Sequence, residues 1–533
     1  MSKVLLIGER PLPIENENFL NGPGIRTWQI AKPLIDDGHQ VCLVCLNTLG
    51  GNFLEQKIKG LDIFPLAQSE FETPDPLQKI HDRFQPDCIV SISSFLQSKA
   101  AVSLKTAKPI WFDRGDLLAE AQLKSSVDNS NDYLYYFLEL EKNILEKGDI
   151  FSCYSLPQKF SLMGKLGNAG RLTQETIGYE FAHVIPCAVE TGDYKLTKNI
   201  VRGKFAQSDD FLILWSGGYN TWADTDTLFS ALEIAMRKNK KIKFVSTGGA
   251  IPGQDERTYN KFTKQINASP YKDRYILLGW RPLNDLANIY LESNLAINID
   301  KNCYEVVLGS RHRILDWMKA RLPILTTAPS ELTQSLSRNQ MAFSFAQQQP
   351  QELAQLILDL SSKPQLLNEY AQRAKNFVEQ EFSFEKTTRA LREWVSRPQL
   401  APDSLEGKKK RIPLPASEAR QIEDLKAQVL NLEAEREQVK VHVNNLNNQV
   451  NTLIAERATL NTHIRNFENE REQVKAHIGN LEAEREQVKI HLANLSKQIS
   501  ALTAERDTLS THIRNLEAER EQVKLYVTGL ESQ

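Results

Sequence analysis

The chain has 533 residues, too many for one ordinary domain, and its 65 basic and 67 acidic side chains leave a net charge of −2. This balance excludes binding of nucleic acid through an overall basic surface. No stretch approaches about 18 apolar residues, and the first residues lack the pattern of a signal peptide, so we expect neither a transmembrane segment nor a leader.

The six cysteines are scattered along the chain. The closest two, Cys42 and Cys45, form a CxxC pair inside an apolar, strand-like run, and no second pair accompanies them. This pattern indicates core packing rather than a zinc or redox site and fits a reducing compartment. We therefore expect a cytoplasmic protein without a bound metal, and peripheral attachment to the inner membrane face stays open.

Short apolar runs alternate with helical periodicity from residue 3 to about residue 190. Four runs are predicted strands, at 4–7, 41–45, 88–92 and 110–112, and three segments are predicted helices, at 25–35, 95–104 and 133–145. Alternation of this kind predicts βαβ units and a parallel sheet that is covered on both faces.

The same alternation then starts again. Further strands are predicted at 211–215, 242–245, 275–278, 295–299 and 324–326, and amphipathic segments separate them. Two successive blocks predict an α/β fold of two Rossmann-like lobes, 1–190 and 191–396, with the open ends of both sheets at a shared cleft. Residues 397–417 contain four prolines and the basic run 408–411, and we interpret them as a flexible linker.

The last part of the chain, 418–533, repeats itself. The nonapeptide LEAEREQVK at 432–440 returns as FENEREQVK at 467–475, and it returns unchanged at 481–489 and 516–524. The offsets of 35, 14 and 35 residues are multiples of seven, so one hydrophobic stripe continues through all four copies. The repeats predict a long α-helical coiled coil.

The heptads also suggest a partner. With Val429 at position a and Leu432 at position d, every d residue up to Leu530 is apolar, and six a residues are arginines that each follow a glutamate. This pattern favours a parallel, in-register homodimer, although the near-identical repeats leave slippage by 14 or 49 residues open. Five histidines recur at heptad multiples, which indicates a solvated flank rather than a metal site or a pH sensor: His442, His463, His477, His491 and His512.

Glycines follow two predicted strands of the second lobe. Gly217 and Gly218 come directly after the strand at 211–215, and Gly248 comes after the next strand. Such glycines let the backbone approach a phosphate, and the N-terminus of the following helix favours an anion. Tight turns of structural origin explain the same residues equally simply, so both interpretations stay open here.

The segment 304–326 carries the clearest chemistry. We expect a loop at 304–310, a helix from Arg311, and a strand after Pro323. Arg313 and Asp316 are three residues apart and share one helix face, so a cation for a diphosphate would lie beside a carboxylate for ribose hydroxyls. A surface ion pair is the alternative.

This segment resembles the donor site of GT-B glycosyltransferases of the family-4 (group 1) type, in which a carboxylate lies seven residues before the proline of a GLPVV-like strand. Asp316 and Pro323 have this spacing, and Arg313 matches the basic residue of many members. Residues 22–41 resemble the first glycine loop, helix and GHEV strand entry, and 276–290 resemble a further family segment. The resemblance covers about residues 4–394.

The resemblance implies a GT-B fold and a hexosyltransferase-like enzyme that needs no metal and no cofactor besides its sugar-nucleotide substrate. It would transfer sugar from a nucleoside-diphosphate sugar to a glycan or lipid-linked acceptor, in polysaccharide or cell-surface glycan assembly. The donor-binding residues that it implies, together with those found above, are Gly22, Gly24, Gly217, Gly218, Gly248, Arg311, Arg313 and Asp316.

The sequence departs from the family pattern at two places. The position of the family's first carboxylate is Leu308, and the nearest acid, Glu305, becomes a catalytic candidate. The basic pair that usually follows the first strand of the second lobe is absent, so phosphate neutralisation would fall to Arg311, Arg313 and backbone amides. Asp113 stands where the family places a histidine-containing turn, and we expect it to touch the sugar or the acceptor as a base, unless it only forms a turn.

Two hypotheses of different classes follow. In the first, the head is an active glycosyltransferase. In the second, it is a degenerate, non-catalytic head, and the protein is a coiled-coil scaffold. The presence of Arg313, Asp316 and the glycine loops favours the first, and the missing basic pair favours the second.

Overall fold

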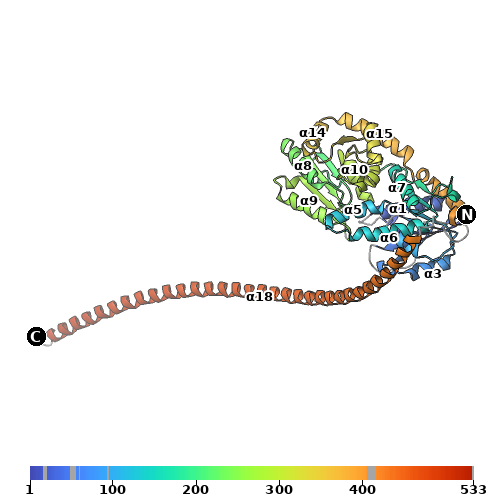
Figure 1. The fold of residues 1–533 in the computed structure, drawn as a ribbon. Coiled ribbons are helices and arrows are strands. Elements are labelled where there is room, and N and C mark those ends of the chain that lie inside the picture. Colours follow the sequence, from blue (N-terminus) through green and yellow to red (C-terminus); the bar gives the residue numbers. More distant parts are fainter. Residues whose placement is uncertain are drawn as a thin grey trace. The chain divides into compact units, whose positions relative to one another are not determined.

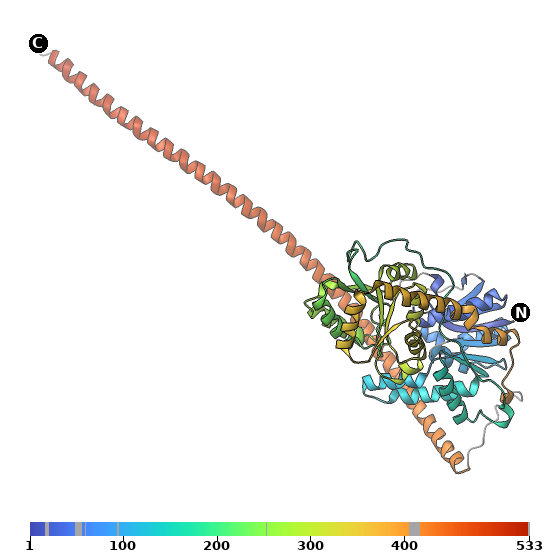
Figure 2. The same ribbon diagram turned by 90° about the horizontal axis from the view of Figure 1, so that it is seen from above.

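The protein is described from a computed structural model, and the description covers residues 1–15, 21–47, 56–58, 60–92, 95–251, 253–404 and 416–530. The chain divides into two compact units, Met1–Pro413 and Leu414–Gln533 (Figures 1 and 2). The first unit contains two sheets with helices on both faces, and the second contains one long helix.

The first sheet, within the described residues, has eight strands in the order β3-β4-β2-β1-β5-β6-β7-β8, and all its pairs are parallel except β3 with β4. Its strands are β1 (Lys3–Arg10), β2 (Gln40–Asn47), β3 (Gln56–Ile58), β4 (Leu61–Leu66), β5 (Cys88–Ile92), β6 (Ile110–Asp113), β7 (Ile150–Cys153) and β8 (Ala182–Val184). The helices of this lobe are α1 (Gly22–Asp36), α2 (Gln68–Phe71), α3 (Pro74–Phe84), α4 (Phe95–Ser103), α5 (Leu117–Asp128), α6 (Asp132–Lys147) and α7 (Leu156–Asn168).

The central strand β1 explains why helices cover both faces. Its run Val4–Ile7 is apolar and fully buried, as in strands that are covered on two sides. Because successive side chains point to opposite faces, Leu5 and Ile7 join one core with α3, α4, α6 and α7. Val4 and Leu6 join the other core, which α1 covers.

The second sheet is parallel throughout its described strands, in the order β11-β10-β9-β12-β13-β14. Its strands are β9 (Phe211–Trp215), β10 (Ile242–Thr247), β11 (Tyr275–Gly279), β12 (Leu295–Asn298), β13 (Ile324–Thr327) and β14 (Phe343–Phe345). The helices that follow from this sheet are α8 (Thr225–Lys238), α9 (Arg257–Ala268), α10 (Leu283–Glu292), α11 (Tyr304–Leu308), α12 (His312–Lys319), α13 (Glu331–Arg338), α14 (Pro350–Ser361), α15 (Pro364–Glu381), α16 (Phe384–Thr387) and α17 (Arg389–Ser396).

The central strand of this sheet, β9, repeats the alternation of β1. Phe211, Ile213 and Trp215 pack with α8 and α14, which lie beside one another in Figure 1. Leu212 and Leu214 pack with α10, α12 and α15 on the opposite face. The predicted fold class of two Rossmann-like lobes is confirmed. The expected loop at 304–310 was wrong in part, because Tyr304–Leu308 is the short helix α11.

The chain returns to the first lobe after the second sheet. Phe384 and Leu391, from α16 and α17, belong to the same core as Val4 and Leu6. Residues 397–404, which the sequence places in a flexible linker, are also packed there: Ala401 is buried, and the carboxylate of Asp403 accepts hydrogen bonds from Arg171 Nε at 2.5 Å and Nη2 at 2.9 Å. The predicted domain boundaries stay predictions, and the basic run 408–411 lies outside the described residues.

The second unit is the helix α18 (Ala416–Leu530), which is continuous over 115 residues. A long C-terminal helix is therefore confirmed, and its pairing into a coiled coil stays a prediction. Over the described chain, no helix combines the length and apolar composition that crossing a membrane requires.

The Arg171–Asp403 pair generates a stability prediction. Both side chains are fully buried, so Asp403→Ala would leave an uncompensated guanidinium and should reduce the free energy of unfolding by about 3–5 kcal/mol. Urea denaturation of the full chain measures the loss. Asp37→Ala is the matched control, because the partly exposed Arg392–Asp37 pair, with side chains 28% and 27% exposed, also joins the returning segment to the first lobe and should contribute only about 0–1 kcal/mol. Equal losses in the two variants would contradict the assignment.

Candidate functional site

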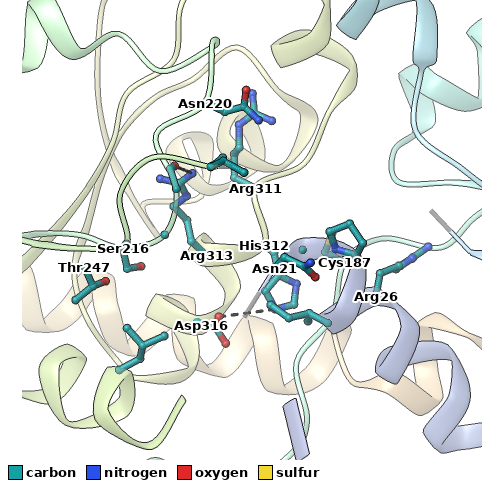
Figure 3. A pocket seen from close by; sticks show the side chains of 18 of the residues that line it. Asn21, Arg26, Cys187, Ser216, Asn220, Thr247, Arg311, His312, Arg313 and Asp316 are labelled. Carbon is teal, nitrogen blue, oxygen red and sulfur yellow. Dashed lines mark hydrogen bonds and ion pairs between the residues drawn. The ribbon is translucent and has the colours of Figure 1, made fainter. Parts of the chain in front are cut away.

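A cavity of about 760 Å³ lies between the two lobes of the first unit. The first lobe contributes Glu9, Asn21, Gly22 and Arg26, and the second contributes residues that follow β9, β10 and β11 and the start of α12. Figure 3 shows labelled side chains of both lobes around this space. The cavity thus lies at the carboxyl ends of β1, β9 and β10, where parallel α/β sheets bind ligands.

The glycine loops of the second lobe form one wall. Gly217 and Gly248 have positive φ angles of 92° and 86°, which favour glycine, and a Cβ at Gly248 would lie 2.2 Å from the carbonyl oxygen of Gly217. A Cβ at Gly218 would lie 2.6 Å from the side chain of Ile251. Only glycine at these positions allows the loop after β9 to contact the loop after β10, and both loops line the cavity.

The first turn of α1 forms part of the opposite wall. Asn21 caps the helix, since its Oδ1 accepts a hydrogen bond from the amide of Gly24 at 2.7 Å. Gly22 lines the cavity, whereas Gly24 does not. Gly24 serves the close approach of the helix start to Pro11, because a Cβ there would lie 2.1 Å from the carbonyl oxygen of Pro11.

Arg26 lines the cavity, but its charge is already balanced. Its Nη2 and Nε donate to the two carboxylate oxygens of Asp113 at 2.7 and 2.9 Å, and Ser152 Oγ donates to the same carboxylate at 2.6 Å. Asp113 is fully buried and does not line the cavity. The predicted contact of Asp113 with a sugar therefore has no support in this geometry, and the residue neutralises Arg26 instead.

Arg311 is balanced as well. Its Nε donates to Asp300 at 3.0 Å, and its Nη1 and Nη2 donate to Glu305 at 3.1 and 2.8 Å. Burial raises the pKa of Glu305, and the charge of Arg311 opposes that rise. Arg311 lines the cavity while Glu305 does not, so the predicted catalytic carboxyl is held in an ion pair behind the wall.

Arg313 differs from these two arginines. Its guanidinium lies 4.3 Å from the ring centre of Trp215, and its buried Nη1 has no hydrogen-bond partner within the described residues. Its Nη2 makes only a long contact, 3.4 Å, with the carbonyl oxygen of Gly218. Burial lowers the pKa of Arg313 to about 10, so the group stays cationic at neutral pH although no carboxylate of the described residues pairs with it. Arg281 also lines the cavity, and its Nε donates a hydrogen bond to the carbonyl oxygen of Leu278 at 3.0 Å.

Asp316 lies one helical turn from Arg313 and lines the same cavity. Its Oδ1 accepts a hydrogen bond from the hydroxyl of Tyr194 at 3.0 Å, and its Oδ2 lies 3.7 Å from Nε2 of His312, the contact dashed in Figure 3. The side chain is 15% exposed, so its remaining acceptor positions can reach a ligand.

Three residues that line the cavity were not predicted from the sequence: Glu9, Cys187 and His312. Glu9, at the end of β1, accepts hydrogen bonds from Asn21 and Gln97, and burial raises its pKa to about 7. Cys187 and His312 interact across the cavity wall: burial alone would raise the pKa of the thiol, but His312 and Arg26 outweigh it and lower the pKa. Burial alone would lower the pKa of His312, but Cys187 and Asp316 raise it. The position of Glu9 at a strand end was a usable signal, whereas the Cys187–His312 contact joins distant segments.

The structure brings most of the predicted donor-site residues together. Seven line the cavity: Gly22, Gly217, Gly218, Gly248, Arg311, Arg313 and Asp316. Three do not: Gly24, Asp113 and Glu305. The roles predicted for all ten stay predictions.

Solved structures share this fold. A sucrose-phosphate synthase from Thermosynechococcus elongatus matches with a TM-score of 0.57 and 15% identity over 74% of this chain and 99% of that chain. Anabaena HepE in complex with UDP-glucose matches with a TM-score of 0.54 and 16% identity over 74% and 100% of the two chains. An E. coli structure described as trehalose-6-phosphate bound with UDP-2-fluoro glucose matches with a TM-score of 0.55 and 12% identity over 75% and 100%.

These likenesses define the class of fold. The two parallel-sheet lobes are those of the GT-B fold, which the glycosyltransferases among these neighbours share. No family model matches the sequence, and no curated protein matches it at a significant level. At 12–16% identity the neighbours show the fold alone.

The Cys187–His312 contact generates a pH-dependent prediction. Because the pKa of Cys187 is lowered and burial raises that of Cys303, iodoacetamide should alkylate Cys187 faster near pH 7. Both residues are partly exposed, so Cys303 is the matched control. The rate ratio, followed by peptide mass spectrometry, should fall toward one as the pH rises above both pKa values. His312→Gln should slow Cys187 at pH 7, and an unchanged rate would contradict the contact.

Proposed function

We propose that the head binds a nucleoside-diphosphate sugar in the cavity between its lobes and transfers the sugar to a glycan or lipid-linked acceptor. The observation that supports this most is the guanidinium of Arg313, a cation that no carboxylate of the described residues pairs with and that lines a cavity at the carboxyl ends of parallel strands of both sheets. Desolvation of such a partly buried cation is costly unless an anion joins it. A diphosphate supplies that anion.

The surrounding groups suit the rest of the donor. The backbone amides of Gly22, Gly217 and Gly218 can donate hydrogen bonds to phosphate oxygens, and the carboxylate of Asp316 can accept hydrogen bonds from ribose hydroxyls. HepE was solved with UDP-glucose on the same fold, so UDP-glucose is the first donor to test. Arg313, and not Arg311, would stabilise the leaving diphosphate, because Arg311 is already held by Asp300 and Glu305.

The family-4 assignment, a role in polysaccharide or cell-surface glycan assembly and a cytoplasmic location are parts of the same proposal. The C-terminal helix would join two copies of the chain as a homodimer. The competing function, a non-catalytic head on a coiled-coil scaffold, is favoured by one observation: Arg26 and Arg311 are both neutralised inside the protein. Binding of a nucleoside diphosphate separates the two functions.

The donor proposal predicts stabilisation by nucleotide. UDP, tested beside GDP and ADP, should stabilise the head by about 2.7 kcal/mol at a hundredfold excess over its dissociation constant, as a thermal-shift assay would show. Arg313→Gln should weaken binding about 10- to 150-fold, because a hydrogen bond to a charged group contributes about 1.5–3 kcal/mol. Arg237→Gln is the control, since Arg237 is an exposed residue of α8 on the same lobe. If none of the three nucleotides raises the melting temperature, the scaffold function is supported instead.

The same electrostatics predict metal independence. If Arg313 and backbone amides stabilise the leaving diphosphate, hydrolysis of UDP-glucose, or its transfer, should persist in EDTA. A coupled assay for released UDP measures this, with and without added Mg²⁺ or Mn²⁺. Complete loss in EDTA that either metal restores would place the charge stabilisation on a metal and not on Arg313.

A further inference from the structure

The helix α18 carries an apolar stripe that nothing covers in the single chain. Its described a and d residues, with Val429 at a and Leu432 at d, recur at alternating spacings of three and four, and the apolar ones are 41–64% exposed. A stripe this long is typical of a helix that pairs with another helix of the same period. The residues on both sides of the stripe, positions e and g, indicate which helix that is.

Glutamates at g match lysines at e. Glu435 lies five residues before Lys440, Glu470 before Lys475, Glu484 before Lys489 and Glu519 before Lys524, which gives eight pairs over the two flanks of a dimer. In a parallel pair of helices, each g residue faces the e residue five positions later on the partner. Within one helix the two do not meet, and these lysines instead contact glutamates three residues earlier, Glu437, Glu472, Glu486 and Glu521.

Histidines occupy position g in several of the intervening heptads, and three of them face a glutamate, in place of a lysine, at position e. His463 lies five residues before Glu468, His477 before Glu482 and His512 before Glu517. The remaining two histidines, His442 and His491, face the uncharged Asn447 and Ser496. With no shift between the helices, no g glutamate therefore faces a glutamate, and no g histidine faces a lysine.

A shift of one heptad removes this complementarity. Glu470 would face Glu482, and His463 would face Lys475, and the same clashes recur along the helix. The repeats alone would also permit a shift of 14 residues, and this shift brings no like charges together. It reduces the number of Glu–Lys pairs in the two flanks from eight to five, however, and it leaves two heptads of the apolar stripe uncovered at each end. A shift of 49 residues uncovers seven heptads.

We propose that α18 binds a second copy of this chain, parallel and without a shift, and that the alternation of Glu–Lys and His–Glu flank pairs selects this register. The apolar stripe supplies the affinity, and the flanks supply the orientation. An antiparallel pair would place g against g and e against e, so the matched spacing of five residues would serve no purpose. This inference is independent of the donor-site proposal.

A charge swap tests the Glu–Lys flank in the full chain. Glu470→Lys, Glu484→Lys and Glu519→Lys together should weaken the dimer at least tenfold, measured as the dissociation constant from sedimentation equilibrium and dilution of labelled protein. Adding Lys475→Glu, Lys489→Glu and Lys524→Glu to the same chain should restore most of the loss. Because these g and e residues do not meet within one helix, their mutual pairing, and the restoration it brings, arises between chains. Failure to restore would overturn the proposed pairing.

The histidine flank has its own matched control. His463→Glu, His477→Glu and His512→Glu would each face a glutamate of the partner and should weaken the dimer severalfold. His442→Glu and His491→Glu face uncharged residues, so they should change the dissociation constant by much less per site. Equal effects per site would show that the histidines do not face e residues of an unshifted partner.

Cross-linking tests orientation and register directly. Leu530→Cys places thiols opposite one another at a d layer only if the helices are parallel and unshifted, so oxidised glutathione should convert most of the protein to a disulfide-linked dimer. Ala518→Cys, at position f away from the stripe, is the control, and the unchanged chain accounts for its own cysteines. A mass of 60.6 kDa at tens of micromolar, or cross-linking at 518 as fast as at 530, would overturn the proposal.

Discussion

The proposed binding of a donor by the head depends on the positive charge of Arg313. Its guanidinium stacks over Trp215 and keeps one buried nitrogen without a described partner, whereas the buried arginines of this cavity, Arg26 and Arg311, are paired with carboxylates. Buried cations without partners are rarely retained for stability, because desolvation opposes them. The glycine loops and Asp316 surround the same space, and these groups together suit an anion that carries hydroxyl groups.

The paired arginines show how the cavity is held open. Arg26 reaches from α1 to Asp113 at the end of β6 and donates to the carbonyl oxygens of Ile185 and Pro186, so it fixes the first turn of α1 against the segment that leaves β8. Arg311 similarly joins the end of β12, through Asp300, to α11, through Glu305. Asp113 and Glu305, the two carboxylates predicted from the sequence as catalytic candidates, therefore fix the positions of segments that line the cavity.

The sequence pattern was sufficient to predict the two α/β lobes, but it was insufficient to predict which charged side chains pair with one another. Continuous apolar runs such as those of β1 and β9 predicted buried parallel strands, because both faces of such a strand are covered. Short elements such as β8 and β14 were missed, since three residues carry too little periodicity. Spacing placed Arg313 and Asp316 on one helix face. It could not reveal that Asp113 pairs with Arg26, 87 residues away, or that Asp403 returns to Arg171, because such partners are fixed only by the tertiary fold.

The most direct measurement is a crystal structure of the protein with UDP-glucose. Diphosphate density is expected between the guanidinium of Arg313 and the loop 216–218, with a ribose hydroxyl within hydrogen-bond distance of Asp316. Arg26 and Arg311 should keep their pairs with Asp113, Asp300 and Glu305. A diphosphate bound elsewhere, or an empty cavity at saturating UDP-glucose, would contradict the account.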